Sequence, residues 1–197
     1  GDDQVKKLLG LGQVITVRGT RNDDGTGSAD TISFDNELAG KVTSVSSADG
    51  SFIILGQTVS LTPDTIIDDS LIEAFRGVDL PEDVKFGDTA LTETLDQLLR
   101  IGDTIVVSGF PSQNGFEATR IEDGSALEAA QVQASGSFEA EVKGKVKNLI
   151  PDTSFSLHGL TVTINSATDF EDFAGTALAE GQFVEVHGSA TSATTIT

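Results

Sequence analysis

One pattern of short strands and glycines occurs twice in full and once more as its second half in this chain of 197 residues. This repetition constrains the fold more than any other feature. The copies of its second half are Leu9–Gly19 with Ala29–Ile32, Leu99–Gly109 with Ala118–Ile121, and Leu178–Gly188 with Ala193–Ile196. Self-similarity of this kind is typical of a repeated structural unit. It predicts the architecture and leaves the ligand open.

The first half of the pattern occurs twice, before the second and third copies. It consists of Gly40–Val42 with Phe52–Val59, and of Gly144–Val146 with Phe155–Val162. Apolar and polar residues alternate through these segments, which indicates strands. In the first complete repeat we predict strands over Gly40–Ser46, Ser51–Leu55, Gln57–Leu61, Asp103–Gly109 and Phe116–Glu122. In the second we predict Ala140–Leu149, Ser154–Leu157, Leu160–Ile164, Gln182–Gly188 and Ala193–Thr197.

A long insertion, Ile66–Leu98, separates the third and fourth strands of the first complete repeat. Ser70–Glu73 matches a capping box, which predicts a short helix over Leu71–Arg76. Leucines at helical spacing predict a second helix over about Ala90–Arg100. The second repeat has only Phe170–Glu180 at this place.

Five strands with a helix between the third and fourth are the layout of an OB-like barrel. We therefore predict an all-β protein with tandem OB-like five-stranded antiparallel barrels and short helices inserted between strands three and four. The predicted parts are an N-terminal hairpin over 1–37, a barrel over 38–123 with its insertion at 66–98, a linker over 124–137, and a second barrel over 138–197. Because a lone hairpin is marginal in water, we expect the N-terminal one to pack on a complete barrel or to pair with another molecule.

The second barrel is predicted to begin with a strand whose two faces differ. Phe138 and Val142 lie on the face with Val146, whereas Glu139, Glu141, Lys143, Lys145 and Lys147 lie on the other. We expect this charged face to be solvated.

Composition excludes several function classes. Twelve basic residues against 31 acidic ones give a net charge of −19, which repels nucleic acid. The chain has no cysteine, so it forms neither a disulfide nor a thiol nucleophile. No apolar run approaches the ~20 residues that span a bilayer. Because the chain starts at Gly1 without methionine, we expect a processed or truncated product, with an N-terminal lipid anchor in the precursor as one alternative.

The order of these motifs resembles a bacterial family called domain of unknown function 5666. The motifs are Gly40–Val42, Phe52–Val59, Val106–Gly109 and Ala118–Ile121, and their counterparts in the second repeat. The resemblance implies tandem small β domains of exported bacterial proteins, often with lipoprotein-type signals, in the periplasm, on the cell surface or outside the cell. It implies no activity and no catalytic residues.

Candidate sites are few. Asp68 with Asp69, and Glu171 with Asp172, follow the third strand of each repeat, and such paired carboxylates are candidate cation ligands. In a first helical turn they also complement the helix dipole. The loop Asn22–Asp30 has oxygen ligands at alternating positions, but a polar hairpin tip is the favoured interpretation.

The two histidines, His158 and His187, do not recur between the copies, and no catalytic residue is predicted. His158 aligns with Leu55 of the first repeat. We predict no cofactor, with calcium as the open alternative at the acidic pairs.

These observations favour a non-enzymatic binding or structural module of the bacterial envelope or exterior. Its expected partner is a protein or a polysaccharide. The alternatives are calcium-dependent adhesion, carbohydrate binding and, less favoured, a hydrolase that uses the insertion. Exposed phenylalanines around a groove would support carbohydrate binding, whereas burial of Phe52, Phe155 and Phe183 would speak against it.

Overall fold

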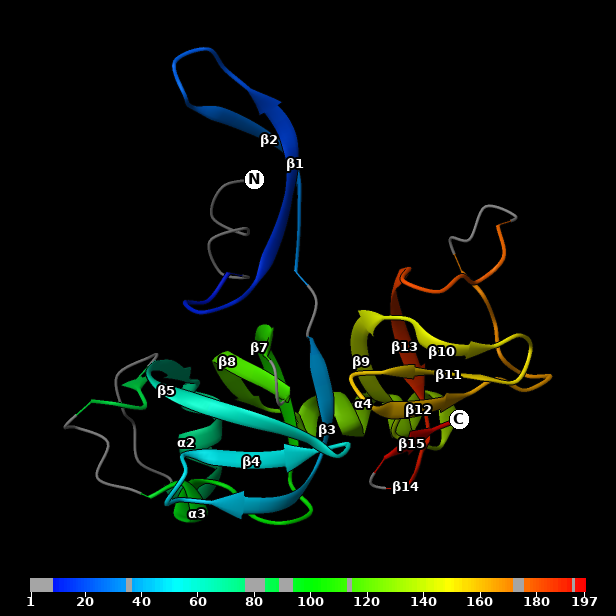
Figure 1. Ribbon diagram of the computed structural model, residues 1–197. Helices are drawn as coiled ribbons and strands as arrows, with labels where there is room; N and C mark the ends of the chain where they lie inside the picture. Colours follow the sequence, from blue (N-terminus) through cyan, green and yellow to red (C-terminus); the bar gives the residue numbers. More distant parts are fainter. Residues whose placement is uncertain are drawn as a thin grey trace.

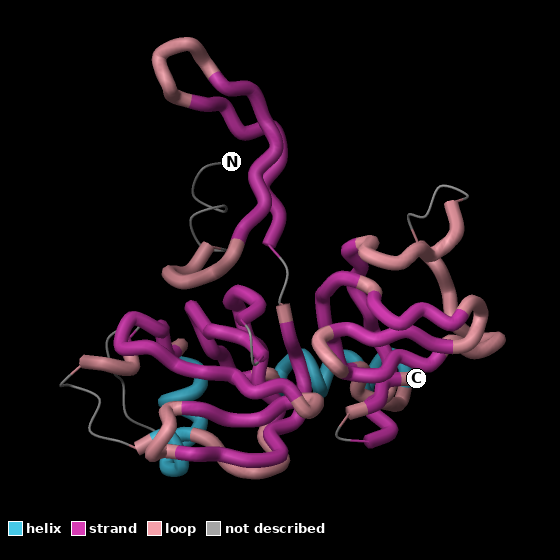
Figure 2. The backbone as a smooth tube through the Cα atoms, viewed as in Figure 1, coloured by secondary structure: helices cyan, strands magenta, loops and turns pink. Residues whose placement is uncertain are grey.

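The computed structural model describes residues 9–34, 37–76, 84–88, 94–112, 115–171, 176–192 and 194–197, without the side chains of residues 34, 73–76 and 135. The described chain is mostly β, as predicted (Figure 2). An N-terminal hairpin projects from a body in which the first complete repeat lies beside the second (Figure 1).

The first complete repeat forms a closed five-stranded barrel. Its strands are β3 (Leu38–Ser46), β4 (Ser51–Ile54), β5 (Gln57–Ile67), β7 (Thr104–Ser112) and β8 (Gly115–Asp123). β3 pairs with β4, β4 with β5, β5 with β8, β8 with β7, and β7 pairs back to β3. All five predicted strands are therefore present.

The prediction of an entirely antiparallel barrel is wrong, because β5 and β8 pair in parallel. The reason is geometric. A ring with an odd number of strands cannot close with every neighbouring pair antiparallel, so one pair must be parallel. The hairpin β7–β8 enters between β3 and β5, which run in the same direction, and the parallel pair falls where it meets β5.

The second repeat has the predicted strands, but they are divided between two sheets. The strands are β9 (Ala140–Lys145), β10 (Lys147–Ile150), β11 (Ser154–Leu157), β12 (Leu160–Thr163), β13 (Phe183–Gly188), β14 (Ala190–Ser192) and β15 (Thr195–Ile196). β9 and β13 extend the sheet of the first barrel through β3, whereas β10, β11, β12, β15 and β14 form a separate sheet.

We predicted a second closed barrel, and the described residues do not show one. The division falls at two interruptions. The predicted first strand breaks at Val146, between β9 and β10, and the predicted fourth strand ends at Gly188, where Ser189 separates β13 from β14. Ser189 instead exchanges two backbone hydrogen bonds of 3.0 Å with Thr197.

The described part of the insertion contains two helices and one short strand. α2 (Asp69–Arg76) begins two residues before the predicted start, and α3 (Leu95–Leu98) is shorter than the predicted helix, part of which lies outside the described residues. β6 (Val84–Lys85), which was not predicted, pairs with β5. Among the described residues, no helix is long and apolar enough to cross a membrane.

The start of α2 corrects the predicted capping box. Ser70 donates its backbone N–H to the Asp68 carboxylate over 2.9 Å, and its hydroxyl also hydrogen-bonds there. Asp68 thus satisfies a backbone donor that would otherwise lack a partner at the start of the helix. The side chain of Glu73 lies outside the described residues.

The segment predicted as a linker contains a helix, α4 (Ser125–Ser135). It ends at Gly136, whose φ of 82° is left-handed and whose N–H bonds Val132 O. Glu128 ties this helix to the first barrel through Lys41 Nζ at 2.6 Å and through Thr104.

These contacts with Lys41 and Thr104 lower the pKa of Glu128. The stability they give is therefore present above the unfolded-state pKa of glutamate and is lost as the pH falls through the lowered value.

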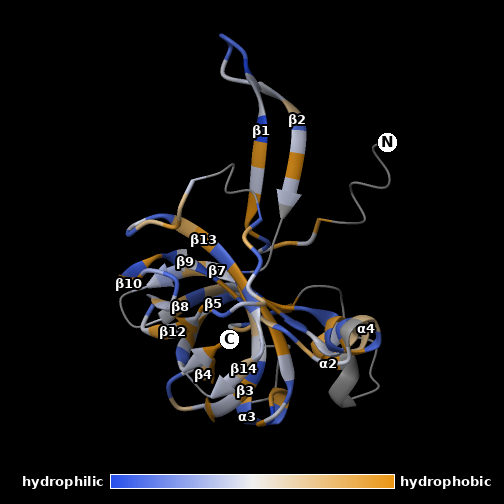
Figure 3. Ribbon diagram, turned by 90° about the vertical axis from the view of Figure 1, so that its right-hand side faces the viewer, coloured by the Kyte–Doolittle hydropathy of each residue, from blue (hydrophilic) through white to orange (hydrophobic). Residues whose placement is uncertain are grey.

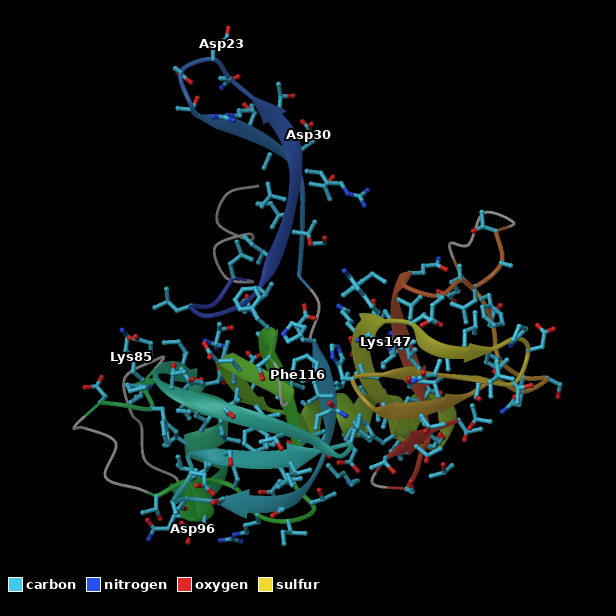
Figure 4. All side chains as sticks on the ribbon, viewed as in Figure 1. Asp23, Asp30, Lys85, Asp96, Phe116 and Lys147 are labelled. Carbon is cyan, nitrogen blue, oxygen red and sulfur yellow. The ribbon has the colours of Figure 1, made fainter. Side chains whose placement is uncertain are left out.

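One apolar core runs through both repeats, and Phe52 and Phe116 are its largest fully buried side chains. His158 joins the repeats, because its ring packs edge-on against that of Phe116 at 5.0 Å (Phe116 is labelled in Figure 4). His158 and Leu55 both have left-handed φ, 48° and 51°, and each precedes a turn glycine. The alignment of these two positions is thereby confirmed.

The N-terminal hairpin consists of β1 (Ile15–Arg21) and β2 (Gly27–Phe34), which pair only with each other in the described chain. Its base contacts the first barrel: Thr119 Oγ1 donates to Gly12 O over 2.6 Å, and Arg120 Nη1 donates to Leu11 O over 2.9 Å. The strands themselves project away from both repeats (Figures 1 and 3). The hairpin is thus anchored at its base, and the described side chains on both faces of its two strands are exposed.

Candidate functional site

Four charged or titratable side chains gather on one face of the neighbouring strands β9 and β13. Glu141 lies directly opposite His187, and Lys143 lies opposite Glu185. The His187 Nε2 atom is 2.9 Å from Glu185 Oε1, and Lys143 Nζ is 3.7 Å from Glu185 Oε2. We call Glu141, Glu185 and His187 the β9–β13 cluster.

The expectation that this face is solvated is wrong for its central residues. Glu141 and Lys143 are each 7% exposed. The reason is the position of β9, which lies between β13 and β3 in the large sheet instead of at an edge. Lys143 also donates its backbone N–H to Glu37 O, which brings the chain after the hairpin against this strand.

A cleft of about 420 Å³ opens beside the cluster. It is lined by the hairpin residues Val14, Thr16 and Ser33, by Glu37, and by Lys143, Phe183, Val184 and Glu185. Phe183 is 58% exposed, in contrast to Phe52 and Phe155, which are buried. The cleft therefore presents one exposed aromatic ring beside charged groups.

The β9–β13 cluster has the chemistry of a divalent-cation site. Its three candidate ligand atoms, two carboxylate oxygens and one imidazole nitrogen, lie within 4.8 Å of one another. A mixed nitrogen and oxygen set suits zinc and its neighbours better than calcium, which takes oxygen ligands. Lys143 partly neutralises Glu185 and is a cation already at the site.

Equivalent positions of the repeats do not predict this cluster. His187 has no histidine or acidic counterpart in the other copies. A usable signal was present in the predicted barrel topology, in which strands one and four are neighbours. Pairing Ala140–Leu149 with Gln182–Gly188 in that way would have placed Glu141 close to His187.

The predicted acidic pairs are not brought together in this way. Asp68 is buried and its carboxylate pairs with the Arg120 guanidinium, which is also buried. Asp69 stands in the first turn of α2, Glu171 is exposed, and Asp172 lies outside the described residues. Asp68 thus has a cationic partner and a capping role, and cation binding at these pairs stays a prediction.

Arg120 is the centre of a buried polar network. Besides Asp68, it contacts Glu122 through Nε at 2.9 Å and Leu11 O through Nη1 at 2.9 Å. It therefore links α2, the barrel strand β8 and the loop that carries the hairpin. The buried charges of Asp68 and Arg120 therefore have a structural role, because they neutralise each other and hold these parts together.

The segment Asn22–Asp30 forms the tip of the hairpin and the start of β2, in agreement with the favoured interpretation. Asp24 accepts hydrogen bonds from the Thr26 backbone N–H at 3.0 Å and from its hydroxyl at 2.6 Å. These bonds lower the pKa of Asp24. Asp23 and Asp30 extend into solvent far from the body (Figure 4).

His158 has a packing role. Its Nε2 lies 3.1 Å from Lys143 O and its ring contacts Phe116. A Cβ atom added to Gly144 would lie 2.6 Å from this Nε2 atom, so the glycine leaves room for the imidazole. Neither of these two contacts, a backbone carbonyl and a phenyl ring, is a nucleophile that His158 could activate.

The sequence profile of the family described as Domain of unknown function (DUF5666) matches residues 39–122 and 143–197. These two segments make up more than half of the chain, and the chain therefore belongs to this family. No curated protein and no solved structure matches it.

The Arg120 network gives a stability prediction. Arg120→Met is expected to lower the free energy of unfolding by about 3–5 kcal/mol, because it leaves the Asp68 carboxylate buried without its guanidinium partner. Adding Asp68→Leu should recover part of the loss, since the unpaired charge is then removed. Urea unfolding measures both.

The control is Lys85→Met, which breaks the exposed pair with Asp64 and should change the stability little. An Arg120→Met chain as stable as Lys85→Met would contradict the assignment.

Proposed function

We propose that this protein is a non-enzymatic binding module of the bacterial envelope or exterior that holds a protein partner through its N-terminal hairpin. The observation that carries the proposal is the exposure of the hairpin's apolar residues. Ile15, Val17 and Ile32 are 41%, 54% and 41% exposed. Apolar side chains on a free two-stranded sheet are a place for another chain to pack.

The non-enzymatic part of the proposal is supported by how the candidate catalytic groups are used. Asp68 and Arg120 neutralise each other, and His158 packs between the repeats. The hydrolase alternative would have to use the insertion around Asp68, where that ion pair lies. Export follows from the resemblance to tandem β domains of exported proteins and is part of the proposal.

The proposal also covers the fold of the two repeats. We infer that the first barrel is OB-like, which its strand order β3-β4-β5-β8-β7 supports. We infer that the second repeat is an interrupted version of the same barrel. The parallel pair β12–β15, which corresponds to β5–β8, supports this inference.

Site-specific photo-crosslinking tests the hairpin as a binding surface. A photoreactive residue in place of Val17 is expected to give one protein adduct in cells, recovered from the envelope or the medium. The same residue in place of Arg18, which points to the opposite face of β1, serves as the control. Ile32→Asp should abolish the Val17 adduct. Equal labelling from both positions, or none from Val17, would contradict the proposal.

Cation-dependent binding is a second candidate function, favoured by the β9–β13 cluster. The exposed ring of Phe183 in the adjacent cleft offers a contact for a polysaccharide. Such a ligand would be held beside the cation, as in calcium-dependent adhesion, although the nitrogen of His187 favours zinc.

A thermal titration tests this candidate. Zinc in excess over its dissociation constant is expected to raise the Tm, because it binds the folded state alone, and a chelator should reverse the shift. Calcium should give a smaller shift. Glu185→Gln and His187→Ala should each remove the zinc effect, whereas Glu171→Gln, at an exposed carboxylate outside the cluster, should keep it. A flat zinc titration excludes the cluster as a cation site.

A further inference from the structure

We propose that β1–β2 is the closing hairpin of a third barrel, whose other three strands come from a partner carrying a half-repeat like β3–β5. The inference deepens the proposed function by stating what kind of chain the hairpin binds. It rests on an equivalence between this hairpin and β7–β8, the hairpin that closes the first barrel.

The two hairpins have the same register. Val17 pairs with Ile32 as Val107 pairs with Ile121. One irregularity follows at the same place in both, between Arg18 and Gly19 in β1 and between Ser108 and Gly109 in β7. Beyond it, Gly19 pairs with Ala29 as Gly109 pairs with Ala118.

The glycine after each irregularity is needed for the same reason. A Cβ atom on Gly19 would collide with the backbone oxygen of Ser28, and one on Gly109 with that of Glu117. Ser28 and Glu117 each precede the paired alanine. β-Bulges bend a strand and set its twist, so a shared bulge gives both hairpins the curvature of a barrel wall.

Equivalent side chains differ sharply in burial. In the first barrel, Ile105, Val107 and Ile121 are each 0% exposed. Their counterparts Ile15, Val17 and Ile32 are 41–54% exposed. The hairpin therefore carries the inward-facing residues of a barrel core without the strands that would cover them (Figure 3).

The first barrel also shows which strands would complete a barrel around the hairpin. There β7 pairs antiparallel with β3, and β8 pairs parallel with β5. The free edge of β1 is therefore shaped for a strand like β3, and that of β2 for a strand like β5. The partner would carry the residues that fill the first barrel from those strands, namely a Gly-x-Val and a Phe-x-x-x-Gly-x-x-Val segment, as in Gly40–Val42 and Phe52–Val59.

A second copy of the chain is a poorer occupant. Its β3, β4 and β5 already close their own barrel. Each copy also has a formal net charge of −19, so two copies repel each other.

A fusion tests the inference on the full chain. Residues 138–177 supply β9 to β12 of the second repeat, which correspond to β3–β5, and the connection after them. They are placed directly before Leu9, which is equivalent to Leu178. Hydrogen exchange of residues 13–34 is expected to slow by about tenfold or more relative to the unfused chain, because both hairpin edges become paired and buried.

Two matched variants keep the result specific. Val17→Asp in the hairpin, and Phe155→Asp in the added segment alone, should each restore the fast exchange. Exchange that is unchanged by the fusion, or slowed equally in both variants, would overturn the inference. Sedimentation of the unfused chain adds a second test, since a dimer abolished by Val17→Asp would make a second copy the occupant.

The outcomes separate this inference from the proposed function. A Val17 adduct in cells together with unchanged exchange in the fusion means that the hairpin binds a partner of another kind. Slowed exchange without any adduct means that the hairpin closes a barrel but holds no protein in the cell.

Discussion

The closure of the first barrel depends on one supersecondary unit, the bulged hairpin β7–β8 between β3 and β5. Val107 and Ile121 face each other across this hairpin and are fully buried by the other three strands. Because five strands close the ring, the hairpin must meet one neighbour in parallel, and it does so at β5. The same unit stands free as β1–β2, and this is why the N-terminal segment exposes residues that belong in a core.

The buried basic side chains lie where different parts of the chain meet. The chain is strongly acidic, yet among the basic side chains that the structure describes, Arg120 and Lys143 are buried. Arg120 ties the hairpin base and α2 to the closing strand β8, and Lys143 lies beside Glu185 at the edge of the cleft. Both buried cations therefore lie where separate parts of the chain meet, in contrast to the exposed acidic residues of the hairpin tip.

The local sequence pattern predicted the features that local sequence controls, namely the strands and the turns. The alternation and the turn glycines gave strands close to those observed, and aligning the copies placed His158 and Leu55 correctly at the same turn. The N-terminal hairpin was also predicted from its likeness to the later copies. In each case the information lies in the local sequence of a repeat or in its likeness to another copy.

What the sequence did not predict depends mainly on pairing between strands far apart in the chain, within a repeat or between repeats. The burial of Glu141 and Lys143 follows from the pairing of β9 with β3, two strands about a hundred residues apart in sequence. The β9–β13 cluster needs the strand pairing across the second repeat, and the division of that repeat into two sheets needs the breaks at Val146 and Ser189. The helix α4 was missed because its Ala-, Gln- and Ser-rich segment was interpreted by composition alone.

The free hairpin already has the register of a barrel-closing hairpin, and backbone cross-strand contacts measured by NMR on the unmodified chain would show this register. We expect Val17 opposite Ile32 and Gly19 opposite Ala29, with the extra residue between these pairs. A pairing shifted by one residue would put Val17 and Ile32 on opposite faces of the sheet, and the hairpin would then lack the inward face of a barrel wall.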